Sequence, residues 1–376
     1  MEKLVRAPYV KTGFQGSTLY LGFGSIQQVI DDPQLQNAIM NSLQRWGTPH
    51  TRKEIQGMLE ADHEPATSRE AIHILTRGRY LLRACDYDRS QRYSRHHLYY
   101  TLSESPPLEA QARLGAATVA LVGCGGIGNV VSSLLVAAGV GRLILLDDDM
   151  VEESNLTRQL MFTESDVGWA KTSALADRLS ERNKAVSITA ICDRATPATL
   201  EALGPPDLLI LSAGAKGILP MVNDHCVRND ISFLHVCYVE DIAAWGPLVI
   251  PEHTGCWSCN RLVAEDDPGS PHLAAVAAQL ASSYQPPSFG PINALASSMA
   301  TVPAFLWVRP LAGHKASPKP TSPHQPTSHP ETSSQTAFPI PPEGPGPSPL
   351  SYYCTPCPLL MIRSYRLVLV YMPHSA

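Results

Sequence analysis

A glycine pattern that directly follows an apolar run most constrains what this chain can fold into. Residues 119–128 read Val-Ala-Leu-Val-Gly-Cys-Gly-Gly-Ile-Gly, and a helical pattern follows at once. A strand, a Gly-x-Gly-x-x-Gly turn and a helix in this order predict phosphate binding at the helix N-terminus. Gly123 permits the tight turn, Gly125 and Gly126 let backbone N–H groups approach the phosphates, and Gly128 allows helix and strand to pack closely.

An acidic triplet supports a nucleotide site. The next apolar run, residues 143–146, ends in Asp147-Asp148-Asp149. This is about 20 residues beyond the glycines, where a ribose-binding carboxylate is expected in a Rossmann unit. Asp147, as a ribose or magnesium ligand, competes for this role with Asp148 and Asp149. An acidic triplet after a strand is also compatible with a plain loop.

Basic residues beyond the triplet indicate that the nucleotide is ATP. The chain continues with Asn155-Leu-Thr-Arg158-Gln159 and then Val167-Gly-Trp-Ala-Lys171. A redox dinucleotide site has no need of an arginine and a lysine beside the phosphates. An enzyme that splits ATP does, because negative charge builds up on the phosphate oxygens in the transition state. The alternative is that Arg158 and Lys171 are solvated surface charges, the usual situation of such residues.

These motifs, together with several others, resemble one superfamily. The further segments are Tyr9-Val-Lys11, Tyr93-Ser-Arg95, Tyr238-Val-Glu-Asp241-Ile-Ala-Ala-Trp-Gly246-Pro247-Leu248 and Gly255-Cys256-Trp-Ser-Cys259. From about residue 92 to 308 the chain resembles the ubiquitin-activating enzyme superfamily of the ThiF, MoeB and HesA type. It is most similar to the members that modify short ribosomally made precursor peptides in microcin C and pantocin A biosynthesis.

The resemblance implies a fold and a set of site residues. The implied fold is α/β: a Rossmann-like, doubly wound, mostly parallel sheet, with a small N-terminal α+β module. The implied cofactors are ATP and Mg²⁺, with Asp147, Asp149 and Asn155 among the nucleotide ligands. Arg158 would hold phosphate in a bidentate manner and Lys171 would act as a mobile point charge. Arg95 would reach the ATP of a partner subunit, which implies a homodimer; the alternative for Arg95 is a charge at a helix start.

Two positions depart from the superfamily pattern. The superfamily places a magnesium-binding aspartate after the strand at 208–211, whereas this chain has Ser212-Ala213-Gly214. Without that carboxylate, the metal must be held by Asp147 and its neighbours, or the chemistry differs. In addition, there is no cysteine between Cys259 and Cys354. The chain therefore lacks a crossover thiol to capture an acyl-adenylate, and a neighbouring group of the same substrate is expected to complete the reaction.

Paired cysteines predict a structural metal site. Cys256-Trp-Ser-Cys259 and Cys354-Thr-Pro-Cys357 together supply four thiolates, the ligand set of tetrahedral zinc. The alternative is that the second pair is fortuitous. Four other cysteines lie in apolar or helical contexts and are expected to be core thiols, namely Cys124, Cys192, Cys226 and Cys237.

Composition sets the outer bounds. Among 376 residues the formal net charge is −5 and no basic cluster stands out, so nucleic acid is not an expected partner. The start of the chain lacks an apolar signal core and no apolar run reaches transmembrane length, so we expect a cytoplasmic protein with no membrane partner.

Pattern changes along the chain suggest four segments. We expect a leader-peptide clamp at 1–88, an ATP-binding adenylation domain at 89–308, a proline-rich disordered segment at 309–352, and a C-terminal end at 353–376. A dimerisation or lid module is the alternative for the first. Residues 310–349 carry 12 prolines and cannot bury a core. They are either a long insertion or the start of a reading frame that departs from the superfamily after about Val308.

Local patterns predict the secondary structure of the adenylation domain. We expect strands near 117–123, 142–147, 186–192 and 207–212, helices near 126–139, 167–182 and 217–228, a strand pair at 231–238 and 242–250, and a helix from Pro291 to about Val308. In the first segment, residues 35–46 and 67–82 are expected to be helical.

The preferred function is ATP-dependent adenylation of a ribosomal precursor peptide, leading to cyclisation, dehydration or nucleotidylation in antibiotic biosynthesis. One rival is adenylation of the C-terminus of a ubiquitin-like sulfur carrier. Another is a non-catalytic nucleotide- or peptide-binding module. A precursor gene of a few dozen codons beside this one would favour the first, and a carrier gene the second.

Overall fold

The largest sheet is an α/β sheet with an antiparallel edge. The computed structural model describes residues 2–259, 275–276, 279–280, 282, 286–307, 358–363 and 366–371. Within them, the sheet has the order β13-β12-β11-β10-β9-β6-β7-β8. Its strands are β6 (Thr118–Val122), β7 (Arg142–Leu146), β8 (Ser187–Ile191), β9 (Leu208–Leu211), β10 (Ser232–Val239), β11 (Ile242–Val249), β12 (Pro358–Arg363) and β13 (Arg366–Tyr371). Neighbouring strands from β8 to β10 pair in parallel, and those from β10 to β13 antiparallel.

Alternating side chains bury both faces of the sheet. In β6, Val119 and Leu121 join one core, while Ala120 and Val122 join another on the opposite face. Side chains of successive strand residues point to opposite faces, so a strand buried on both sides is apolar throughout. This explains why the apolar runs in the sequence are continuous rather than alternating, and it confirms the doubly wound fold.

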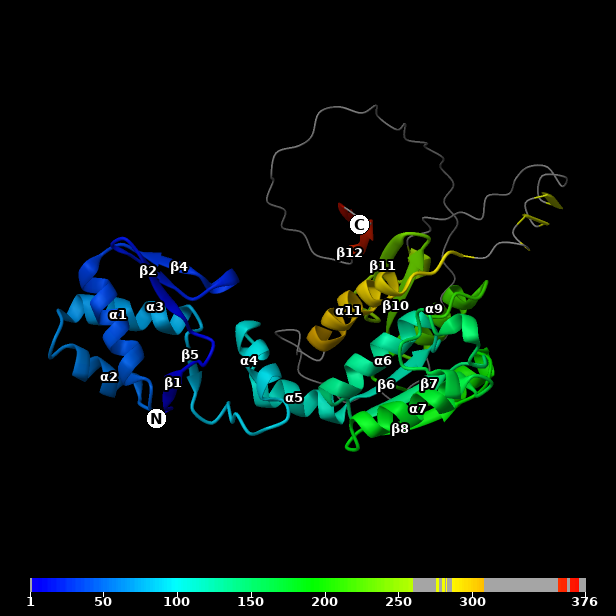
Figure 1. Cartoon of the computed structure of the whole chain (residues 1–376), viewed down its shortest axis with the longest axis horizontal. Coiled ribbons are helices and arrows are strands. Elements are labelled where there is room, and N and C mark those ends of the chain that lie inside the picture. The colour runs from blue at the N-terminus through cyan, green and yellow to red at the C-terminus, as the bar shows by residue number, and fades with distance from the viewer. Residues whose placement is uncertain are drawn as a thin grey trace, which may run out of the picture.

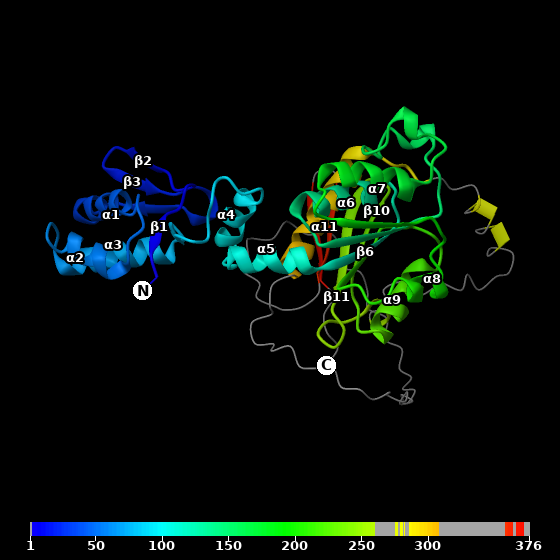
Figure 2. The same ribbon diagram turned by 90° about the horizontal axis from the view of Figure 1, so that it is seen from below.

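Helices cover the two faces. Figure 2 shows α6, α7 and α11 on one side of the sheet and α8 and α9 on the other. The helices are α6 (Gly126–Ala138), α7 (Lys171–Arg182), α8 (Pro197–Ala202), α9 (Ile218–Arg228) and α11 (Gly290–Trp307). Helix α11 lies along α6, where the Ser297 hydroxyl donates a hydrogen bond to the Ile127 carbonyl at 3.1 Å.

The N-terminal module has a core of its own. It contains β1 (Leu4–Arg6), β2 (Thr12–Gln15), β3 (Thr18–Leu21), β4 (Gln28–Ile30), α1 (Pro33–Arg45), α2 (Arg52–Leu59), α3 (Pro65–Arg77) and β5 (Leu81–Arg83). Strands β2, β3 and β4 form a three-stranded sheet, and β1 pairs with β5. Trp46 and Tyr80 are fully buried among the aliphatic side chains of this core.

Two helices join the module to the sheet. They are α4 (Ser94–Leu102) and α5 (Pro107–Ala116), and both lie between the module and the sheet in Figure 1. Just before α4, the Tyr93 hydroxyl accepts a hydrogen bond from Asn183 Nδ2 at 3.0 Å. The same hydroxyl lies 2.2 Å from where a Cβ at Gly139 would be, so only glycine fits there. Tyr93 thus attaches the start of α4 to the ends of α6 and α7.

The expected elements of the adenylation domain are present, with bounds shifted by a few residues. Helix α7 starts at Lys171 rather than near 167. In the N-terminal module, the helix expected at 67–82 ends at Arg77, and Leu81–Arg83 is a strand. Residues 309–352 lie outside the described residues. No helix among the described residues is long and apolar enough to cross a membrane.

Candidate active site

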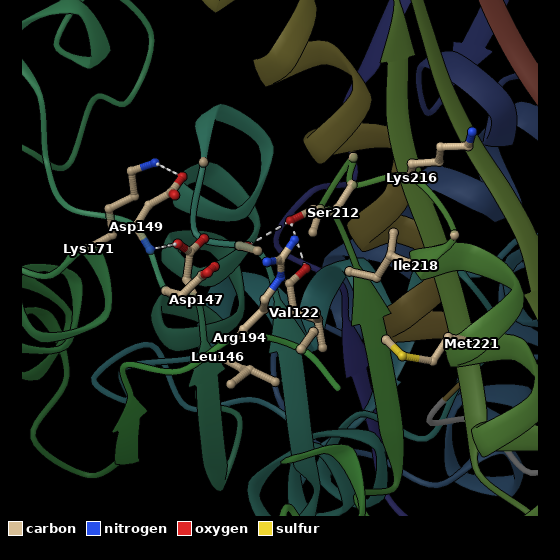
Figure 3. Close-up of a pocket in the computed structure, with 18 residues that line it drawn as sticks. Val122, Leu146, Asp147, Asp149, Lys171, Arg194, Ser212, Lys216, Ile218 and Met221 are labelled. Carbon is tan, nitrogen blue, oxygen red and sulfur yellow. Dashed lines mark hydrogen bonds and ion pairs between the residues drawn. The ribbon is translucent and has the colours of Figure 1, made fainter. Parts of the chain in front are cut away.

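A cavity of about 560 Å³ opens at the carboxyl ends of β6, β7 and β9. Figure 3 shows the side chains that line it, with the acidic residues on one wall and Ile218 and Met221 of α9 on the other. Open α/β sheets bind ligands in this place, where the chain order of neighbouring strands reverses. Here the reversal lies between β6 and β9, because β7 follows β6 in sequence but lies on its other side.

The glycine turn between β6 and α6 is set by close backbone contacts. Gly123 has φ +100°, and a Cβ there would lie 2.6 Å from the Ala213 nitrogen. A Cβ on Gly128 would lie 2.0 Å from the Gly123 carbonyl oxygen. Both positions therefore require glycine, as the sequence predicts. Ser212 strengthens the turn by donating a hydrogen bond to that carbonyl at 2.7 Å.

The N-terminus of α6 faces the cavity without a side-chain cap. Its N-cap residue is Gly125, which lines the cavity and has no side chain to accept from the first helical N–H groups. The first N–H groups of a helix have no partner within it, and the helix dipole places partial positive charge there. The α6 N-terminus is therefore suited to bind a phosphate.

Asp147 is held by two backbone N–H groups. Cys124 N–H donates to its Oδ2 at 2.6 Å, and Asp149 N–H donates to its Oδ1 at 2.9 Å. Burial raises the pKa of Asp147 above its usual value, although these two hydrogen bonds oppose the shift. The carboxylate is thus fixed beside the glycine turn with lone pairs left for a ribose hydroxyl or a cation.

Lys171 reaches the same wall from the first turn of α7. Its side chain is buried, and its Nζ lies 2.7 Å from Asp149 Oδ2. Backbone contacts bring the two residues together: Met150 forms a β-bridge with Ala170, and Lys171 N–H donates to the Asp149 carbonyl. The structure therefore brings Lys171 to the cavity, as the sequence predicts.

Five predicted nucleotide-site residues do not line the cavity, namely Arg158, Asn155, Arg95, Gly126 and Gly128. Arg158 donates to the Ser154 carbonyl of its own turn at 2.7 Å. Asn155 is buried, and its Oδ1 accepts from Glu152 N–H at 3.3 Å within that turn. Arg95 is exposed near the start of α4. Gly126 and Gly128 lie within the first turn of α6, directly after the cavity-lining Gly125.

The start of α11 closes over the glycine turn. Asn293 is buried, and a Cβ on Gly126 would lie 2.2 Å from its Nδ2. The first residue of α11, Gly290, lies close to the turn that carries Arg158, because a Cβ on Gly290 would lie 3.4 Å from the Thr157 carbonyl oxygen. Helix α11 therefore holds the glycine turn and the Arg158 turn at a fixed separation.

Two cations in the cavity were not among the predicted site residues. Arg194 follows β8, and Lys216 lies in the loop after β9 that replaces the superfamily aspartate with Gly214. Neither belongs to a motif, so only the three-dimensional structure reveals them.

Carboxylates near the mouth of the cavity fit a hard cation. Oxygen atoms of Asp147, Asp148 and Asp149 lie within 4.8 Å of one another. Oxygen ligands are those Mg²⁺ prefers. Because Asp147 accepts two backbone hydrogen bonds and Asp149 pairs with Lys171, Asp148 has the carboxylate with the most coordination sites left.

The first cysteine pair has the spacing of half a zinc site. Cys256 Sγ and Cys259 Sγ lie 3.3 Å apart at the 3₁₀ turn η4 (Trp257–Cys259), which Asn223 fixes by accepting from Trp257 N–H at 2.9 Å. Although burial opposes it, hydrogen bonding with Cys259 lowers the pKa of Cys256. Cys354 and Cys357 lie outside the described residues. Of the expected core thiols, Cys124 and Cys226 are buried and Cys237 is half-buried, but Cys192 is exposed, so that prediction is wrong for Cys192.

The chain shares part of its length with curated adenylyltransferases. It is 39% identical over 145 residues to the adenylyltransferase and sulfurtransferase MOCS3 of Sus scrofa, covering 38% of this chain and 31% of that protein. It is 31% identical over 169 residues to the sulfur carrier protein ThiS adenylyltransferase of Escherichia coli K12, covering 45% of this chain and 66% of that protein. The chain thus spans only about a third of MOCS3.

Solved structures match over a longer part of the chain. MccB of E. coli bound to ATP has a TM-score of 0.74 and 28% identity, covering 81% of this chain and 89% of MccB. A second structure is that of MccB, a microcin C7 biosynthetic enzyme, in complex with N-formylated MccA. It has a TM-score of 0.75 and 29% identity. PaaA, at 20% identity and a TM-score of 0.61, shares the fold.

The motifs of the cavity lie in the region that the family comparison identifies. The model of the ThiF family matches residues 93–337, which contain the glycine turn, the acidic triplet and Lys171. This region is more than half of the chain. The chain therefore belongs to the ThiF family.

Proposed function

We propose that the protein is an ATP-dependent adenylyltransferase that activates a short ribosomally made precursor peptide. The observation that carries the peptide substrate is the extent of the match to MccB. That match covers 81% of the chain, more than residues 93–376 hold, so it extends into the N-terminal residues. The match to the ThiS adenylyltransferase covers 45% of the chain.

The cavity supports the adenylation step. A carboxylate or carboxamide oxygen of the peptide attacks the α-phosphorus of ATP. The bond from that phosphorus to the bridging oxygen breaks, and pyrophosphate leaves with the electron pair. Attack from within the peptide on the activated carbon then displaces AMP, which gives cyclisation or dehydration. In the alternative outcome, a peptide nitrogen attacks the α-phosphorus of ATP and pyrophosphate leaves, which forms a nitrogen–phosphorus bond.

Each residue has a role that follows from its position. The α6 N-terminus at Gly125 binds phosphate, and Asp147 accepts hydrogen bonds from the ribose. Lys171 leaves Asp149 to meet the negative charge that builds up on the phosphates. Bound Mg²⁺ would neutralise phosphate charge, held by Asp148 with Asp147. Arg158 has to turn away from the Ser154 carbonyl to reach the same phosphates.

The N-terminal module and a second subunit complete the proposal. We propose that residues 1–88 bind the leader of the peptide, since this module has its own core and is joined to the sheet through α4 and α5. We also propose a homodimer in which Arg95 acts on the ATP of the partner subunit. Arg95 is exposed on α4 and lies outside the cavity of its own chain, as a residue acting in trans requires.

Mass spectrometry of reaction products tests the proposal. The protein is incubated with ATP, Mg²⁺ and synthetic peptides encoded next to its gene, with Lys171→Ala as a matched control. A peptide changed by adenylation or loss of water, together with AMP or pyrophosphate, is expected only for the unchanged protein. If every such peptide stays unchanged, the peptide substrate is wrong.

Adenylation of a sulfur-carrier protein is the second candidate, favoured by the sequence identity to the ThiS adenylyltransferase. A carrier with a diglycine C-terminus in the same assay distinguishes the two. Carrier adenylate formation with no peptide product would favour this candidate.

A further inference from the structure

The cavity contains an arginine, Arg194, whose guanidinium is unpaired within the described part of the chain. Arg194 lines the cavity, and Figure 3 shows its side chain in the middle of it, between Asp147 and the α9 residues Ile218 and Met221. Among the described residues, its guanidinium forms no hydrogen bond or ion pair, although three carboxylates line the same cavity.

The backbone of Arg194 is fixed by its neighbours. Its N–H donates to Asp193 Oδ1 at 2.7 Å, and its carbonyl accepts from Thr199 Oγ1 at 2.8 Å. Thr199 also closes a capping box with Thr196 at the start of α8. The next residue, Ala195, packs on the core of that face. The position of the side chain is therefore set by the fold, while its charged end is free.

The order of the strands places Arg194 beyond the ribose site. The phosphates belong at α6, which follows β6, and the ribose belongs at Asp147, which follows β7. Strand β8 is the next in the sheet: Leu146 lies opposite Ile191, and Asp147 N–H donates to the Ile191 carbonyl. A nucleotide that continues in this direction puts its base near the end of β8, from which the Arg194 side chain reaches into the cavity.

We propose that Arg194 binds the nucleobase of ATP by stacking its guanidinium on the ring. The planar, weakly hydrated guanidinium can lie flat on an aromatic ring, whereas the compact, strongly hydrated ammonium of lysine cannot stack in this way. The buried Leu146 gives the cavity an apolar floor beside this position. This inference rests on the proposed use of ATP, and it adds a nucleotide-binding residue that belongs to no motif of the chain.

Calorimetric titration of the full chain with ATP and with inorganic tripolyphosphate tests the role. Arg194→Ala is expected to weaken ATP binding about ten-fold and to leave tripolyphosphate binding unchanged. Arg194→Lys is expected to bind ATP as weakly as Arg194→Ala, because lysine keeps the positive charge but lacks the planar guanidinium. Arg142→Ala, which removes an exposed arginine at the opposite end of β7, serves as the matched control and should bind ATP as the unchanged protein does. In the adenylation assay, Arg194→Ala should raise KM for ATP and leave kcat nearly unchanged.

The possible results separate this inference from the proposed function. If the unchanged protein binds ATP and Arg194→Ala binds it equally well, the stacking role is wrong and the proposed function stands. If Arg194→Lys restores affinity and tripolyphosphate binding falls in Arg194→Ala, the residue contacts phosphate and the inference is overturned. If the unchanged protein binds no ATP, both are wrong.

Discussion

Lys171 Nζ lies 2.7 Å from Asp149 Oδ2, and the two partners differ in exposure. The lysine side chain is 7% exposed and the aspartate side chain 67%. Removing the lysine therefore leaves a carboxylate that water can solvate, rather than a buried unpaired charge. The pair is suited to hold a lysine ready for phosphate at small cost in stability.

Lys171→Ala should abolish AMP formation while the protein stays folded. Loss of one preorganised cation costs about 3–4 kcal/mol of transition-state stabilisation. The free energy of unfolding should change by about 1 kcal/mol or less, because the remaining carboxylate is exposed. AMP release and urea denaturation of the variant, with the exposed Lys184→Ala as control, provide the measurement. Turnover at the level of the unchanged protein would exclude Lys171 from the site.

Arg158→Ala should have the same effect on AMP formation, by the same reasoning about phosphate charge. Within the described residues its guanidinium makes one hydrogen bond, to the Ser154 carbonyl, so thermal stability should change little. Arg142→Ala, which removes an exposed arginine from the start of β7, is the control. Normal turnover of the variant would show that Arg158 only stabilises its own turn and does not take part in catalysis.

Mixed dimers test Arg95. In a mixture of Arg95→Ala and Lys171→Ala subunits, one site of each mixed dimer contains both an intact Arg95 and an intact Lys171. Activity should therefore reappear in the mixture, although each variant alone is inactive. The measurement is AMP formation after co-expression of the two chains. An inactive mixture, shown to contain mixed dimers, would contradict a shared site.

Affinity for ATP should fall as the pH is lowered. The charged form of Asp147 accepts from the ribose, so affinity is full above the pKa and is lost as the pH falls through it. Because burial raises this pKa, the loss begins at a higher pH than for an ordinary aspartate. Titration of ATP at several pH values, beside Asp147→Asn, checks this. The asparagine variant should bind weakly with a flatter profile, and the same profile in both proteins would assign the pH dependence to another group.

Metal analysis tests the paired cysteines. If Cys354 and Cys357 join Cys256 and Cys259, purified protein should hold about one zinc per chain. Cys256→Ser and Cys354→Ser should both release it, because structural zinc requires all four ligands. Cys192→Ser, at an exposed cysteine outside both pairs, should keep the metal. Full zinc content in Cys354→Ser would show that the second pair is not part of the site.

The sequence predicts the sheet well because burial on both faces makes its strands conspicuous. The apolar runs of β6, β7 and β9 are continuous, and Gly123, Asp147 and Ser212 directly follow them. The N-terminal module is harder to predict from its sequence. Its helix α3 ends at Gly78, and Arg79 then adopts φ +62°, which turns the chain into β5. The apolar pattern continues through this break, so a single helix was the expectation.

Two features of the site depend on tertiary structure. The apolar context of Cys192 in the sequence predicts a core thiol, but the residue comes directly after β8. This strand lies at an edge of the sheet and has only β7 as a neighbour among the described strands. Arg194 follows it in a polar loop without any motif. Its place in the cavity results from the strand order, which brings the ends of β7 and β8 together.

The pairing of β11 with β12 also determines which strand forms the antiparallel edge of the sheet. Ala243, Ala244 and Trp245 of β11 pair with residues of β12, which come from a distant part of the chain. A sheet edge without a partner presents a row of free N–H and C=O groups, and such a row is a template for another strand. In a chain cut before Pro358, β11 becomes that edge. The hairpin of β12 and β13 thus covers β11 and makes β13 the edge of the sheet.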